Sequence, residues 1–378
     1  MANFIPATPR NDTIHSRQIA FAAAFLLPVS KLLEAPSILA QYAAGDLLLP
    51  ALLHFLLQSA VLAGLLYAAS RSETPLLERL QNALGGWTVV FYALYAVYFV
   101  FSVLLPILDL EKFVYAAFFD TAPTMFSFAF FFILCAFVCS KGIKTVGRLA
   151  DLCLFLFLFP FLALIAMSLA EADFTNLLPL FGTKFGDTMS AFTRVTPHFS
   201  DAILLLPLIG SRRYKKGDAP KIMAGYWAGA LCVFLFLAVF FGTYSSIAAR
   251  QHYAFSKIAQ YFPALSVIGR IDLIFVYLLS ATLFFFTCLP LQYATDLVCR
   301  CVRTERRTLF AAILSFGLFL FTLFCNKYYN SFYAVISGNL FSVFWLIADL
   351  VPLFLIFLPR DRRSETQRST RKKEARRV

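Results

Sequence analysis

The chain has 378 residues and a net charge of +12, yet 60% of its residues are hydrophobic and only 14% are charged. Its mean hydropathy of +0.75 is too high for a soluble domain of this size. Several apolar runs exceed the roughly 18 residues that a membrane-spanning helix needs. We therefore expect an all-α polytopic membrane protein, and nothing in the basic charge points to nucleic-acid binding, because there is no folded basic domain or binding motif.

Ten apolar segments are predicted to cross the membrane, and the polar residues lie mainly between them. They are 17–42, 47–70, 87–108, 123–140, 149–170, 189–210, 222–248, 271–298, 308–325 and 338–358. Together they form one predicted membrane domain, 16–358, whose halves 16–171 and 187–358 are similar in length. Because each half opens with an interrupted span, we predict a five-plus-five inverted repeat of the LeuT-like type.

The distribution of Lys and Arg predicts the orientation. With both termini inside the cell, 25 of the 33 basic residues lie in inner segments, six lie in outer connections, and only Lys31 and Arg194 lie within apolar spans. Residues 1–15 then form a cytoplasmic segment and residues 359–378 a basic cytoplasmic tail. The tail either binds anionic lipids or a partner, or is a solvated tail that follows the positive-inside rule.

Prolines interrupt the first and sixth predicted spans. Pro28 and Pro36 flank the stretch that contains Ser30, Lys31 and Glu34, and Pro197 lies beside Thr196, His198 and Phe199. Proline removes a backbone donor and disfavours helix in the residue before it. Broken backbone at membrane depth is tolerated where it is buried or lines a cavity. The two breaks are therefore the predicted substrate site.

Lys31 lies near the middle of the first span and needs a partner or a wet cavity, because a charge at this depth costs about 2.5–3.5 kcal/mol. Glu34, three residues further on, is one candidate partner, and the pair would then pin the break. Alternatively, Lys31 is a fixed cation in the substrate or ion site. Arg194 either extends toward the outer surface or binds a substrate carboxylate.

Other polar residues in the spans complete the predicted site. Ser200 and Asp201 suit an N-cap of the second half of the broken span, whose free N–H groups would bind a carboxylate. His198 could titrate or be a structural hydrogen-bonding group. Tyr98 either packs against neighbours or directs its hydroxyl into the cavity. Ser280 and Thr282 could bind a cation, although Ser and Thr also serve helix packing.

Catalytic motifs are missing from the sequence. There is no Gly-x-Ser-x-Gly, His-Glu-x-x-His or P-loop pattern. We therefore expect no enzymatic activity, no cofactor and no metal site.

Five short motifs, taken in order, carry a family resemblance. They are Pro36-Ser-Ile-Leu-Ala40, Asn176-Leu-Leu-Pro179, Phe199-Ser-Asp-Ala-Ile-Leu-Leu-Leu-Pro207, Phe262-Pro263 and Arg270-Ile-Asp272. With the ten predicted spans, they make residues 16–358 resemble the spore-germination permease family, the integral membrane subunit of nutrient germinant receptors in the amino acid–polyamine–cation superfamily.

The resemblance implies a site between the broken first and sixth spans, closed by the third and eighth. It implies an amino acid or similar small nutrient as ligand, a large membrane subunit and a lipoprotein as partners, and the inner membrane of a bacterial spore as location. Where family members carry a Gly-rich break, this chain has Pro28-Val-Ser-Lys-Leu-Leu-Glu34. A lysine there suits a proton-linked or cation-independent cycle, or a receptor that only senses its ligand.

Two other functions remain open from the sequence. The chain could be a freestanding amino-acid or organic-cation transporter, or a membrane scaffold with a vestigial site. A receptor subunit needs partner subunits, whereas a transporter moves solute by itself. In a scaffold, replacement of Lys31, Arg194 or Asp201 would change stability only.

Overall fold

The computed structural model describes residues 14–71, 74–118, 124–179, 181–260, 272–328, 331, 335 and 338–357. The tail 359–378, residues 1–13 of the N-terminal segment and the motif residues Phe262, Pro263 and Arg270 lie outside this part. Within it, every secondary-structure element is a helix.

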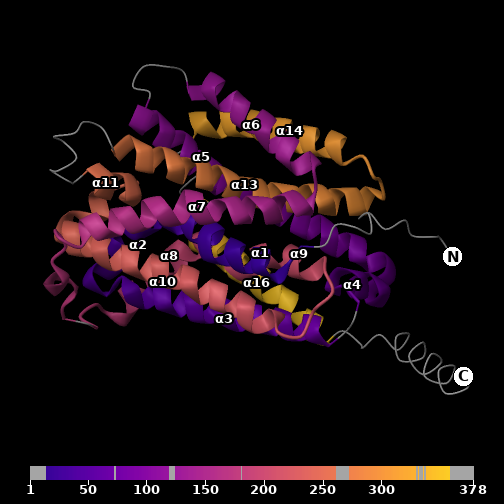
Figure 1. The fold of residues 1–378 in the computed structure, drawn as a ribbon, viewed down its shortest axis with the longest axis horizontal. Coiled ribbons are helices and arrows are strands. Elements are labelled where there is room, and N and C mark those ends of the chain that lie inside the picture. The colour runs from indigo at the N-terminus through magenta and orange to yellow at the C-terminus, as the bar shows by residue number, and fades with distance from the viewer. Residues whose placement is uncertain are drawn as a thin grey trace, which may run out of the picture.

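The longer helices run in nearly one direction through the bundle (Figure 1). They are α3 (Leu48–Ser70), α5 (Thr88–Phe118), α7 (Ile143–Ser168), α10 (Asp218–Tyr244), α13 (Asp272–Val302) and α14 (Arg307–Lys327). Shorter α-helices are α4 (Leu76–Leu84), α6 (Thr124–Ser140), α11 (Ala254–Gln260) and α16 (Asn339–Leu350), which continues into the 3₁₀ turn η8 (Val351–Phe357). The 3₁₀ turns η3 (Ala44–Asp46), η4 (Gly85–Trp87), η5 (Phe174–Leu177) and η7 (Ser245–Arg250) lie in the connections.

Both predicted breaks are present. The first segment begins as α1 (Ser16–Phe21), passes through a π turn, η1 (Ala22–Leu26), and a 3₁₀ turn, η2 (Leu27–Lys31), and resumes as α2 (Ala35–Ala43). The two halves are bent by 61°. The second segment consists of α8 (Phe185–Val195), the 3₁₀ turn η6 (Thr196–His198) and α9 (Asp201–Gly210). Each break contains a proline, which explains why neither segment is one continuous helix.

Six helices in the described part are long and apolar enough to cross a membrane, or seven if the bent pair is counted as one span. A helix or helix pair occupies each of the ten predicted ranges, but the segments 129–140 and 341–357 are short. Ten crossings and the repeats 16–171 and 187–358 therefore stay predictions. Some helices extend beyond the predicted spans: α5 continues to Phe118 and so places Lys112 in a helix, and α7 begins at Ile143 rather than near residue 149.

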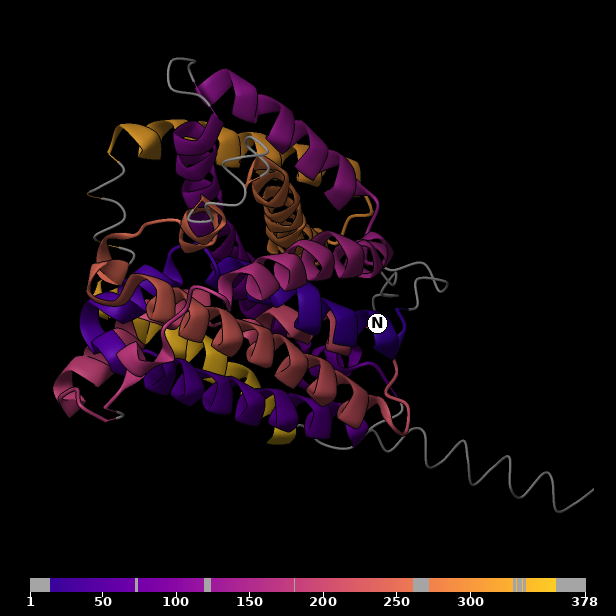
Figure 2. The same cartoon turned by 60° about the vertical axis from the view of Figure 1, so that its left-hand side comes forward.

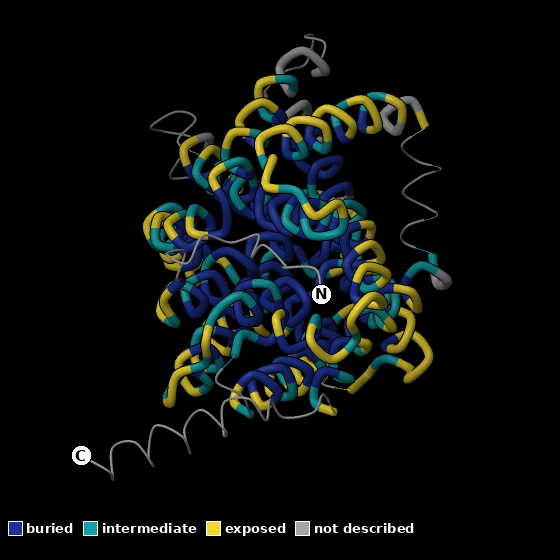
Figure 3. Tube along the Cα trace, turned by 90° about the vertical axis from the view of Figure 1, so that its right-hand side faces the viewer, coloured by how far each residue is buried: buried dark blue, intermediate teal, exposed yellow. Residues whose placement is uncertain are grey.

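The bundle has a pair of helices at each of two opposite edges and a central group between them. Helices α6 and α14 lie at one edge and α3 and α10 at the opposite edge, as two views show (Figures 1 and 2). The broken segments and α16 lie between them. Buried residues gather in the centre and exposed ones around the circumference (Figure 3). Large apolar side chains such as Phe155 and Phe130 are more than two-thirds exposed, which suits a surface that faces lipid.

Two glycines let α10 approach the first broken segment closely. Gly225 and Gly229 are one turn apart and face the backbone of Ala20 and Ala23. A Cβ at Gly229 would lie 2.6 Å from the Ala23 carbonyl oxygen and 2.9 Å from Cγ of Pro28. This small-xxx-small spacing allows backbones to pack in a membrane bundle, and here it supports the helix that carries the break.

We expect Gly229→Ala to lower the free energy of unfolding by about 1–3 kcal/mol, because the added methyl group has no space. Thermal unfolding of the purified protein measures the change. Gly317→Ala in α14 is the matched control, since a Cβ there meets nothing within 4 Å. Equal stability of the two variants would contradict the close-packing role of Gly229.

Candidate functional site

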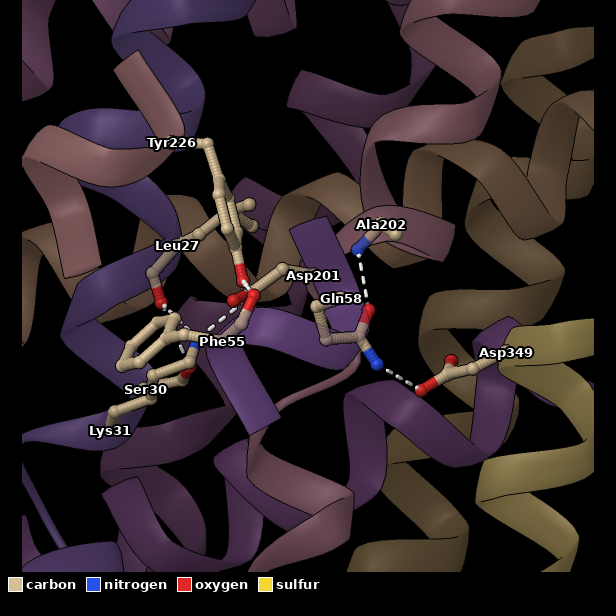
Figure 4. Close-up of polar contacts among 9 residues, drawn as sticks. All are labelled: Leu27, Ser30, Lys31, Phe55, Gln58, Asp201, Ala202, Tyr226 and Asp349. Carbon is tan, nitrogen blue, oxygen red and sulfur yellow. Dashed lines mark hydrogen bonds and ion pairs between the residues drawn. The ribbon is translucent and has the colours of Figure 1, made fainter. Parts of the chain in front are cut away.

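The two breaks meet in the centre of the bundle, where they share an ion pair. Helix α2 packs against α8, and α1 lies beside α9. Nζ of Lys31, at the end of η2, lies 2.6 Å from Oδ1 of Asp201, the first residue of α9 (Figure 4). The two side chains are 1% and 3% exposed. Lys31 also donates to the carbonyl of Leu27, at 3.1 Å, and its ammonium lies 5.3 Å from the ring centroid of Phe199.

The predicted Lys31–Glu34 pair is therefore wrong. Glu34 instead lies 3.3 Å from Nδ1 of His252, which follows η7. The reason is local: residues 32–34 are not helical, so the two side chains do not share the face that i,i+3 spacing would give them on a helix. The break separates the charges and turns Lys31 toward α9.

Ser200 occupies the N-cap position of α9, as predicted, but the predicted side-chain cap is wrong. The side chain of Ser200 makes no capping hydrogen bond, and the carboxylate of Asp201 is engaged by Lys31. Instead, Oε1 of Gln58 on α3 accepts the N–H of Ala202 at 3.0 Å. The predicted carboxylate site at the start of α9 is thus already partly filled. Gln58 was missed from the sequence, although an amide within an apolar span is a signal of a buried polar contact.

The Gln58 amide continues to a second carboxyl group. Its Nε2 donates to Oδ2 of Asp349 on α16 at 2.6 Å, and the hydroxyl of Tyr98 on α5 donates to Oδ1 at 3.2 Å (Figure 4 shows the Gln58 contacts). We call Gln58, Tyr98, Asp349 and the Ala202 N–H the α9 brace. The hydroxyl of Tyr98 therefore makes a polar contact, and its partner is Asp349. No role was predicted for Asp349 from the sequence.

Histidines and aromatic rings surround the ion pair. His54 of α3 stacks on Phe192 and Phe199, with ring centroids 3.9 and 4.9 Å apart, and its Nε2 lies 2.8 Å from the carbonyl of Phe192. His198 is buried, and its Nε2 lies 3.9 Å from Oδ2 of Asp109 on α5. Phe199 thus links the cation of Lys31 to the stacked ring of His54.

The remaining predicted site residues are placed as follows. The guanidinium of Arg194, half-buried on α8, lies 5.8 Å from the ring of Tyr42 on α2. The hydroxyls of Ser30, Thr196 and Thr282 donate to carbonyls of their own segments, those of Leu27, Phe192 and Leu278. Ser280 is half-buried on the same helix as Thr282. A cation at Ser280 and Thr282 stays a prediction.

A cavity lies at the end of the bundle that carries α4. Its volume is about 20 Å³, room for little more than one water molecule, and its lining is mainly aromatic and aliphatic. Asp296 lines it and pairs with Arg307 at 3.2 Å and Arg300 at 3.9 Å. Phe99 contacts both Tyr98 and Tyr293, with ring centroids 5.5 and 5.3 Å away. Phe99 therefore contacts the α9 brace on one side and lines the cavity on the other.

The described residues contain no cluster of three or more His, Cys, Asp or Glu side chains able to hold a metal ion. The geometry is that of a polar centre built on two helix breaks, in which Lys31 and Asp201 neutralise each other. The family model for spore germination proteins matches residues 15–331. The chain belongs to the spore germination permease family. No curated protein matches this permease sequence at a significant level.

We expect Lys31→Met to destabilise the protein by about 3–5 kcal/mol, because Asp201 would be left buried without a counter-charge. Asp201→Asn should destabilise it for the converse reason. The double variant should be more stable than either single variant. Thermal unfolding of the three variants measures this coupling, and strictly additive losses would contradict the ion pair.

The Glu34–His252 contact predicts a small pH dependence. The hydrogen bond with Glu34 raises the pKa of His252 above its ordinary value. The contact therefore stabilises the fold at pH values below the ordinary pKa of histidine, and this contribution is lost as the pH rises through the raised value. Because the His252 side chain is 69% exposed, we expect less than about 1 kcal/mol.

Thermal unfolding of wild type and His252→Gln at several pH values tests the pH dependence of the Glu34–His252 contact. The difference in melting temperature should be present in mildly acidic buffer and vanish in mildly alkaline buffer. A difference that grows with rising pH would show that the sign is wrong.

Proposed function

We propose that this chain is the nutrient-sensing, permease-like subunit of a spore germinant receptor. The observation that carries the proposal is the buried Lys31–Asp201 ion pair, which joins two helix breaks in the middle of the bundle. Family membership supports the germination context. In this proposal the chain has no enzymatic activity and needs no cofactor.

The proposed architecture is a ten-span, LeuT-like inverted repeat with both termini in the cytoplasm. The residues of the two breaks, together with Tyr98 and Arg194, surround the ligand site. An amino acid or similar small nutrient binds there, and Ser280 and Thr282 are the proposed ion-binding residues. The protein lies in the inner membrane of a spore or in the cell membrane, in contact with lipid.

Ligand binding must favour one arrangement of the broken helices, because a ligand with equal affinity for two states shifts neither. The Lys31–Asp201 pair can make the ligand affinity differ between the two arrangements. A ligand that carries its own charges would either replace one partner of the ion pair or add to the attraction between the two. A change in the relative position of α2, α8 and α9 would then reach the proposed partners, a large membrane subunit and a lipoprotein.

Ligand-induced thermal stabilisation tests this function. We expect one compound in a panel of amino acids, sugars and nucleosides to stabilise the purified chain, by about 2.7 kcal/mol at one hundred times its dissociation constant. Arg194→Ala and Lys31→Met should each weaken this response at least tenfold in affinity. Lys184→Ala is the control, because Lys184 is exposed at the start of α8.

Equal responses of wild type, Arg194→Ala and Lys31→Met would contradict the site assignment. The Lys31→Met/Asp201→Asn variant serves where Lys31→Met alone does not fold. If no compound stabilises the isolated chain, the same panel is applied to the chain co-purified with partner subunits, and failure there as well would overturn the proposal.

The second candidate is a freestanding amino-acid or organic-cation transporter. The small pocket at the α4 end is the observation in its favour, because Leu206 and Pro207 of α9 line it and it therefore lies beside one of the broken segments. Uptake of the stabilising compound into vesicles that contain only this chain would support the transporter, whereas binding without uptake supports the receptor subunit.

A further inference from the structure

Asp349 is a buried carboxyl group without an opposite charge. It is 2% exposed, on α16, within the last predicted span. Among the described residues it makes no ion pair, in contrast to Asp201 and Asp296. An isolated carboxylate in an apolar interior is costly, and an ionisable group at membrane depth is a functional candidate.

The hydrogen bonds around Asp349 identify its chemistry. The N–H of Ala202 requires an acceptor, so Oε1 of Gln58 must face Ala202 and the NH₂ group must face Asp349. Tyr98 donates to the other carboxylate oxygen. Both oxygens of Asp349 therefore face donors. A metal cation would instead need several oxygen ligands directed at it, so the arrangement favours a proton.

The other titratable groups around Asp349 leave it without a cation. Asp201 adds a second negative charge on the α9 side, but Lys31 already neutralises it. The hydroxyls of Tyr95 and Tyr226 donate to the carbonyls of Ala348 and Phe55. On the elements packed against α16, the guanidinium of Arg194 lies over Tyr42, and His198 faces Asp109.

We propose that Asp349 is a proton-binding site whose occupancy is passed through Gln58 to the start of α9. The step is simple: the carboxylate takes a proton from a hydronium ion, which leaves one water molecule and a neutral carboxyl group. The carboxyl O–H on Oδ1 can then donate a hydrogen bond to the Tyr98 oxygen, because a phenol oxygen also accepts, and the Tyr98 hydroxyl hydrogen rotates away from Asp349.

Proton uptake changes the strength of the α9 brace. A charged acceptor forms roughly twice as strong a hydrogen bond as a neutral one. When Asp349 is neutral, its hold on Gln58 weakens, and Gln58 in turn fixes the Ala202 N–H beside Asp201. The proton site thus acts on the residue next to the ion pair. A role for this coupling in ligand sensing rests on the proposed function, whereas proton binding and its effect on Gln58 need no nutrient.

Infrared difference spectroscopy of the full chain in lipid, without ligand, tests the site. We expect a carbonyl band of a protonated carboxyl group that grows as the pH is lowered and moves in heavy water. The band should be lost in Asp349→Asn and kept in Asp187→Asn, the matched change at an exposed aspartate. A band that is the same in Asp349→Asn, or that never changes with pH, would overturn the proposal.

Tyr98→Phe keeps the test valid if Asp349→Asn does not fold. It retains the carboxyl group but removes one donor to its ionised form. The pH at which the band reaches half its height should then be higher than in wild type, by about one pH unit. An unchanged midpoint would overturn the assignment of the titrating carboxyl group to Asp349.

Amide hydrogen exchange of a peptide that covers the start of α9 tests the coupling. After correction for the intrinsic effect of pH, exchange in wild type should be faster below the transition than above it. Asp349→Asn should exchange at the faster rate at both pH values. Equal rates throughout would overturn the coupling, whereas failure to find a nutrient would affect only the proposed receptor function.

Discussion

The rest of the structure depends on how the charge of Lys31 is neutralised in the middle of an apolar bundle. A lysine at this depth requires a partner, and the nearest carboxylate in sequence, that of Glu34, is turned away by the break. Asp201 supplies the charge from the other half of the chain. The pair therefore holds η2 against the start of α9. It joins the two proline-interrupted segments at the breaks themselves.

A buried ion pair of this kind does not by itself stabilise a fold strongly, because the desolvation of both charges offsets much of their attraction. Its more important effect is specificity. Any arrangement that separates Lys31 from Asp201 leaves two uncompensated charges in a low-dielectric interior. The broken helices consequently have few permitted positions.

The start of α9 brings two polar systems together. Asp201 belongs to the ion pair, and the adjacent Ala202 N–H belongs to the α9 brace, which reaches Asp349 through Gln58. Side chains from η2, α3, α5 and α16 thus form one network of polar contacts at the start of α9. Around this centre, the close contact at Gly225 and Gly229 brings α10 against the first broken segment, while the circumference remains apolar and exposed (Figure 3).

The sequence by itself determined the helical class, the two breaks and most of the residues near them. Apolar run length, proline position and the cost of an intramembrane charge are local properties, so they can be deduced from one chain. Only the tertiary structure decided the partners: Asp201 rather than Glu34 for Lys31, and Gln58 rather than Ser200 for the cap of α9. These contacts join residues more than 140 positions apart, and their formation depends on how the helices pack, which local spacing does not specify.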